Sequence, residues 1–127
     1  MTTSYETLPG LAGVYLEDSY VLAIDEGPHS LAFRLEAVLT PDHPLYRDPR
    51  PGEQYCYVNA TLTFSPASQV EWISRTGTSY RDADDEEDQG NIDYLNPEPG
   101  AYHLGGDWGE IRVRSPHPPT FQVLQDA

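Results

Sequence analysis

The sequence predicts a mainly β fold, either an antiparallel β-sandwich or a partly open barrel, with long proline-rich and acidic loops. Several short segments alternate apolar and polar residues with a period of two, which is typical of strands with one buried face. Twelve prolines interrupt these segments, and no long segment shows the period of a helix. We expect residues 1–127 to form a single β-rich domain with one modest core.

The clearest pair of strands lies in the first third of the chain. Residues 20–25 and 30–39 are predicted to form two antiparallel strands, joined by a turn that contains a Gly-Pro pair. Just before them stand two adjacent carboxylates, Glu17 and Asp18. Neighbours in a strand face opposite sides, so these two side chains cannot flank one substrate bond. A turn or bulge near Ser19 is expected instead.

Loops and further strands alternate through the rest of the chain. Four prolines predict an irregular crossover at residues 40–53. Gly105, Gly106 and Asp107 are predicted to form a tight turn, and Trp108 should lie in or near the core. The further strands are expected at residues 55–64, 69–76, 91–95, 101–104, 108–114 and 120–125.

The charge balance excludes several classes of function. The chain has 21 acidic and 7 basic residues, all of the latter arginine, and a formal charge of -14. Direct binding to nucleic acid or to an anionic membrane needs positive side chains near phosphates, so neither is expected. No run approaches the roughly 18 apolar residues of a membrane span, and the first residues lack the pattern of a secretory signal. A cytoplasmic location is therefore predicted.

The densest charge lies in residues 80–94, a segment that begins with a predicted long loop at residues 80–90. A preformed acidic surface accelerates encounter with a basic protein, and an aromatic or aliphatic anchor inside it provides affinity. The segment combines both features, so a basic protein partner is predicted to bind there. The predicted contact residues are Tyr80, Asp82, Asp84, Asp85, Glu86, Glu87, Asp88, Ile92, Asp93 and Tyr94.

Catalysis is not predicted. None of the P-loop, dinucleotide-binding, zinc-finger or nucleophile-elbow patterns occurs, and no cofactor is expected. Cys56 falls on the apolar face of a predicted strand, where a cysteine is ordinarily an inert small hydrophobe. His103 and Asp107 flank a predicted turn and would share a zinc ion only if another element supplied two more ligands.

Two alternatives to a protein partner use the same acidic segment. The first is calcium, held by the carboxylates of Asp82, Asp84, Asp85, Glu86, Glu87, Asp88 and Asp93. If Gly90 is aligned with the glycine of a calcium loop, the twelfth position is Asn96 rather than a bidentate glutamate, which weakens this reading. The second alternative is an acidic face that imitates nucleic acid and binds several DNA-binding proteins.

Four stretches resemble a known class of proteins: VYLEDSYVL, GEQYCY, the acidic passage into GNIDYL, and YHLGGDWGEIRVR. Together they look like the small, acidic, β-rich bacterial proteins that accompany polymorphic toxins as immunity proteins. The resemblance implies a protein that inhibits a toxin by binding it, without chemistry of its own. It assigns no role to any individual residue.

Overall fold

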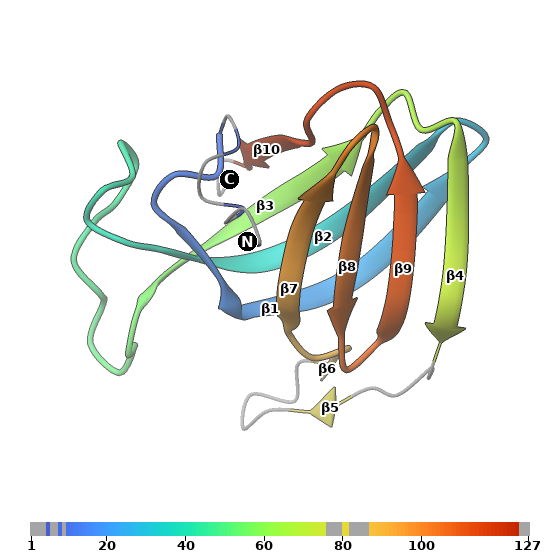
Figure 1. Cartoon of the computed structure of the whole chain (residues 1–127). Coiled ribbons are helices and arrows are strands. Elements are labelled where there is room, and N and C mark those ends of the chain that lie inside the picture. Colours follow the sequence, from blue (N-terminus) through green and yellow to red (C-terminus); the bar gives the residue numbers. More distant parts are fainter. Residues whose placement is uncertain (1–4, 6–7, 9, 76–79, 82–86, 125–127) are drawn as a thin grey trace.

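The computed structural model describes residues 5, 8, 10–75, 80–81 and 87–124, and it confirms the predicted β-sandwich (Figure 1). Two four-stranded sheets, antiparallel throughout, face each other, and both are open. A third sheet has two very short strands. The strands are β1 (Val14–Gly27), β2 (Ser30–Leu39), β3 (Cys56–Phe64), β4 (Gln69–Arg75), β5 (Tyr80–Arg81), β6 (Glu87–Asp88), β7 (Ile92–Glu98), β8 (Ala101–Gly106), β9 (Gly109–Arg114) and β10 (Thr120–Val123).

The strand order explains how the two layers form. The first sheet has the order β1-β2-β3-β10 and the second has the order β4-β9-β8-β7. The chain therefore changes layers between β3 and β4 and returns before β10 (Figure 1). As predicted, β1 and β2 form a hairpin and residues 40–53 contain no strand. Within the described part of the chain, no helix has the length and apolar character needed to cross a membrane.

The core lies between the two sheets and confirms the predicted alternation. In the register of β2 with β3, the inward pairs include Phe33 with Leu62 and Leu35 with Ala60, all fully buried. Cys56 is also buried, at the start of β3, as predicted. Outward positions of these two strands carry polar and aromatic side chains, among them Glu36 and Tyr57. The alternation therefore places these polar and aromatic side chains on the outer face of β2 and β3.

A large irregularity in β1 confirms the bulge predicted near Ser19. The register with β2 shifts between Tyr15, which faces Val38, and Tyr20, which faces Glu36. Ser19 is fully buried there, and its hydroxyl donates to the carbonyl of Tyr15 at 2.7 Å and accepts from the amide of Val38 at 2.9 Å. Because Ser19 satisfies both backbone groups, the extra residues are accommodated without an unpaired amide at Val38.

The turn between β8 and β9 corrects one prediction. Its two central residues are Asp107 and Trp108, whereas Gly105 and Gly106 belong to β8. A Cβ atom at Gly105 would lie 2.3 Å from the ring of Tyr94, and one at Gly106 would meet the backbone just before β7. The two glycines are thus needed for close approach rather than for the turn itself.

Trp108 joins the two sheets at one end of the sandwich. It is 1% exposed, and its ring centroid lies 5.2 Å from that of Phe33 in the opposite sheet and 6.0 Å from that of Trp72. Its indole N–H donates to the carbonyl of Asn91 at 3.0 Å. Trp108 therefore fills the core and also holds the segment that leads into β7.

Candidate functional site

Most of the predicted acidic contact residues cannot be placed. Asp82, Asp84, Asp85 and Glu86 lie outside the described residues. Of the neighbouring positions, Tyr80 pairs with Asp88 and Arg81 with Glu87 through backbone bridges between β5 and β6. The predicted loop at residues 80–90 therefore contains a short two-stranded ladder, because the backbone on both sides of the acidic run pairs with itself.

Two of the three predicted anchor side chains, Ile92 and Tyr94, can be located, and neither is freely exposed at the surface. Ile92 is 0% exposed and belongs to the core, so it cannot contact a partner. Its inward position follows from the period of β7, which also buries Leu95. Tyr94 is half-buried on the outer face of the second sheet, where its ring lies over Gly105 and its hydroxyl bonds to Glu110. An aromatic ring that covers a cross-strand glycine is a common way to stabilise a sheet.

Asp93 is exposed, yet its surroundings disfavour its charge. Partial burial, followed by the nearby negative charges of Asp107 and Glu17, raises the pKa of the Asp93 carboxyl. A carboxyl whose folded-state pKa is raised destabilises the fold once it ionises, so it costs stability at neutral pH. Carboxylates from β1, β7 and the turn after β8 therefore gather at one edge of the sandwich.

Asp93→Asn should consequently raise the melting temperature at pH 7 by about 1–3 °C. This gain in melting temperature should shrink as the pH falls through the pKa of Asp93, because the protonated Asp93 side chain is then uncharged, like the asparagine that replaces it. Thermal denaturation at pH 7 and about pH 3.5 measures both values. Asp25→Asn, at an exposed position of β1, is the matched control. Equal effects of the two substitutions would contradict this account.

Backbone hydrogen bonds attach the end of the acidic segment to β1. The amide of Val21 donates to the carbonyl of Gly90 and the amide of Gln89 donates to the carbonyl of Val21, each at 2.8 Å. The Asn91 side chain donates to the carbonyl of Ser19 at 2.7 Å. We call this border the acidic edge and define it by Glu17 and Asp18 of β1, Asp93 of β7 and Asp107 of the turn after β8.

A cluster of tyrosines covers the outer side of the first sheet next to the acidic edge. Tyr20 of β1 and Tyr57 of β3 stack at a centroid distance of 6.4 Å, and Tyr55 meets Tyr57 edge-on at 6.1 Å. Tyr15 and Tyr20 remain 37% and 36% exposed. We call this cluster the tyrosine face and define it by Tyr15, Tyr20, Tyr55 and Tyr57, with the carboxylates of Asp18 and Glu36 beside them.

The carboxylates interact directly with these rings. A hydrogen bond to Asp18, followed by the negative charge of the same residue, raises the pKa of the Tyr55 hydroxyl. Burial and then the charges of Tyr20 and Glu36 raise the pKa of Tyr57. Both phenols are therefore neutral hydrogen-bond donors at physiological pH. The face combines aromatic area, donors and negative charge, and aromatic residues with a polar end are enriched in protein interfaces.

An apolar pocket of about 190 Å³ opens beside the tyrosine face. We call it the tyrosine pocket. It lies between the ends of β1, β2 and β3 and the proline-rich crossover, and none of its lining side chains is charged. The lining residues are Tyr15, Val38, Leu39, Thr40, Pro41, Tyr46, Pro49, Gln54, Tyr55 and Cys56.

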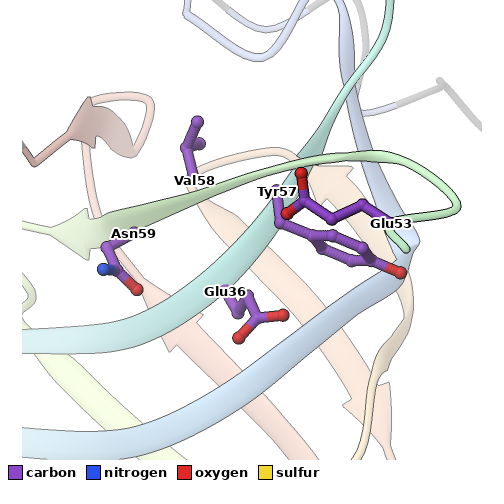
Figure 2. A pocket seen from close by; sticks show the side chains of 5 residues that line it. All are labelled: Glu36, Glu53, Tyr57, Val58 and Asn59. Carbon is purple, nitrogen blue, oxygen red and sulfur yellow. The ribbon is translucent and has the colours of Figure 1, made fainter. Parts of the chain in front are cut away.

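A second hollow of about 170 Å³ lies on the other side of Tyr57 and is lined by polar groups (Figure 2). Glu36 and Glu53 are its charged lining residues, and Asn59 and Val58 complete it. Figure 2 shows the carboxylate of Glu53 beside the ring of Tyr57. Asn59 projects from β3 on the side opposite to Val58, and Glu36 comes from the neighbouring β2. Uncharged and charged hollows thus adjoin the same group of tyrosines.

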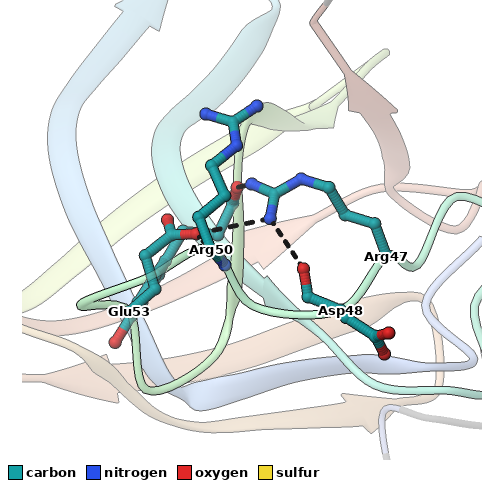
Figure 3. A network of polar contacts seen from close by, with 5 residues as sticks. Arg47, Asp48, Arg50 and Glu53 are labelled. Carbon is teal, nitrogen blue, oxygen red and sulfur yellow. Dashed lines mark hydrogen bonds and ion pairs between the residues drawn. The ribbon is translucent and has the colours of Figure 1, made fainter.

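Arginines from the crossover fix the position of Glu53 (Figure 3). Arg47 pairs with Glu53 at 3.3 Å and also donates to the carbonyls of Asp48 and Tyr57. The amide of Arg50 donates to Glu53 at 2.8 Å, which is the main reason why the pKa of Glu53 is lowered. The crossover is therefore attached to the sheet, and it holds the wall of the tyrosine pocket in place.

Groups that could carry out catalysis or bind a metal are scattered through the described residues. The ring nitrogen of His103 pairs with Glu110 at 2.5 Å on the outer face of the second sheet. Cys56 is buried with 1% of its surface exposed. In the described ranges, no group of three or more His, Cys, Asp or Glu side chains is arranged to hold a metal ion. The calcium alternative depends mainly on residues outside those ranges.

Comparison with known proteins gives no further assignment: no family model, no curated protein and no solved structure matches the chain.

Sequence reasoning missed the tyrosine face, although part of the signal was present. Tyr55 and Tyr57 stand on the polar side of a predicted strand, where small or charged residues are more usual. Their neighbours Tyr15 and Tyr20 come from β1 and meet them only through the register of β1, β2 and β3. An alternating strand pattern shows which side a residue faces, but it does not show which strands are neighbours.

Proposed function

We infer that the protein is a non-enzymatic binding protein, an inhibitor of the immunity type, that docks a basic protein partner on the tyrosine face and the acidic edge. One observation carries the proposal. Exposed Tyr15 and Tyr20 lie on the same strand as the carboxylates Glu17 and Asp18, and hydrogen bonds at Val21 bring the end of the acidic segment to that strand. Aromatic anchors beside a charged rim are the features of a tight, electrostatically steered interface.

The dimensions of the hollows favour a protein ligand over a small-molecule substrate. Pockets that enclose drug-sized ligands usually measure about 300–1,000 Å³. The two hollows beside the tyrosine face measure about 170 and 190 Å³, which is enough for one side chain each. A partner protein can use several such shallow features at once, whereas a single small ligand would bury too little surface in either of them.

The net charge of -14 favours a basic partner. The long-range field of the protein attracts cations and repels other acidic molecules, and this attraction mainly increases the rate of encounter. The charge also agrees with a partner whose substrate is nucleic acid, because such proteins expose arginine and lysine where phosphates bind.

Co-expression with the product of the adjacent gene, followed by kinetic binding measurements, tests this proposal. A stable complex is expected, and its association rate constant should fall about tenfold or more between about 0.05 and about 0.5 M NaCl. The dissociation rate should change less over that range, since the tyrosine contacts are uncharged. Failure to recover a complex, or an association rate that is indifferent to salt, would contradict the proposal.

A further inference from the structure

The tyrosine pocket differs chemically from the surface around it. The protein carries 21 acidic residues, yet none of the residues that line this pocket is charged, and most of them are tyrosines, prolines and aliphatic residues. Val38 at its base is 1% exposed although it lies on the outer side of the sheet. Crossover residues Thr40, Pro41, Tyr46 and Pro49 line the same pocket as Val38.

The rim of the pocket is acidic, and one residue belongs to both environments. The ring of Tyr55 forms part of the apolar wall, while its hydroxyl is hydrogen-bonded to the carboxylate of Asp18. The guanidinium of Arg47 is already paired with Glu53, which also accepts a hydrogen bond from the backbone amide of Arg50. A cation that comes to the Asp18 side therefore meets a carboxylate and a tyrosine ring.

We propose that the tyrosine pocket receives one aromatic or long aliphatic side chain of the basic partner, an inference that rests on the proposed function. An arginine or lysine next to this side chain in the partner's sequence pairs with Asp18. The volume of about 190 Å³ accommodates a single side chain. Burial of an apolar anchor supplies affinity, and the flanking cation is selected by charge complementarity. The recognised element is thus an apolar residue with basic neighbours.

Peptide titrations followed by amide NMR shifts test this inference without the natural partner. The probe is the capped peptide Arg-Arg-Phe-Arg-Arg, compared with Arg-Arg-Ala-Arg-Arg and Glu-Glu-Phe-Glu-Glu. The first peptide should shift the amides of Tyr15, Thr40 and Tyr55. The alanine peptide should bind about tenfold more weakly, and the acidic peptide should not bind.

A pocket-filling substitution provides the matched control. Thr40 lines the pocket, and its amide bonds to the carbonyl of Gly13, a contact that a new side chain leaves intact. Thr40→Phe should abolish the preference for the phenylalanine peptide. Thr120→Phe makes the same chemical change at an exposed position on β10 and should leave the preference unchanged.

Three results would overturn the inference: no peptide binding at millimolar concentration, equal affinity for the phenylalanine and alanine peptides, or equal behaviour of the two threonine variants. None of these results decides whether the intact partner binds. The Thr40→Phe variant separates the two proposals. If it still forms a salt-sensitive complex with the intact partner at native affinity, the proposed function stands, but the pocket is not part of the interface.

Discussion

Trp108→Ala should lower the free energy of unfolding by about 3–5 kcal/mol, the usual cost of deleting a large buried aromatic side chain. The indole is 1% exposed and contacts the rings of Phe33 and Trp72. Its loss also leaves the carbonyl of Asn91 without the indole donor, and an unsatisfied buried acceptor carries its own penalty. Urea denaturation followed by circular dichroism measures the change.

Trp108→Phe is the control that separates the contribution of ring packing from that of the hydrogen bond to Asn91. It keeps most of the apolar contact with Phe33 but removes the hydrogen bond to Asn91, so it should cost clearly less than the alanine variant. A loss below about 1 kcal/mol for Trp108→Ala would show that this end of the core is not tightly packed. Because Asn91 also bonds to Ser19, the alanine variant should weaken the attachment of the acidic segment to β1 as well.

The double substitution Tyr20→Ala and Tyr57→Ala should increase the dissociation rate of the partner complex by about 100-fold or more. The two rings stack on each other, and tyrosines at the centre of an interface commonly cost about 2 kcal/mol each when they are truncated. The association rate should change little, because neither side chain is charged. Surface plasmon resonance with the purified partner measures both rates.

Tyr94→Ala is the matched control and also tests the competing location. Tyr94 lies on the outer face of the opposite sheet, where it packs over Gly105. If the partner uses the tyrosine face, this substitution leaves the dissociation rate nearly unchanged. If the partner instead binds residues 80–94 through Tyr94, the single substitution accelerates dissociation and the double substitution does not. Circular dichroism of each variant verifies that it is folded.

Local pattern predicted most of the fold. The hairpin of β1 and β2, the crossover at residues 40–53 and the burial of Cys56 all follow from alternation and proline positions. The turn after β8 was predicted two residues too early at its start, because the glycine pair suggested a turn. The structure uses Gly105 and Gly106 to admit the ring of Tyr94 and the backbone before β7.

The candidate site was less predictable because it depends on contacts between distant segments. Ile92 was expected at the surface, but its place in β7 points it into the core. The link between β1 and the acidic segment needs two backbone hydrogen bonds at Val21, which no sequence pattern encodes. Dense charge predicted only residues 80–94, whereas the carboxylates of β1 and the tyrosine face required the register of three strands.

Hydroxyl-radical footprinting of the tyrosine side chains, with and without the bound partner, shows whether the partner covers the tyrosine face. Tyr15 and Tyr20 are 37% and 36% exposed in the free protein, so their oxidation can be measured and can fall on binding. The bound partner should strongly reduce the labelling of both residues and leave that of Tyr94 unchanged. Protection of Tyr94 with undiminished labelling of Tyr15 and Tyr20 would contradict this prediction and place the interface on the opposite sheet.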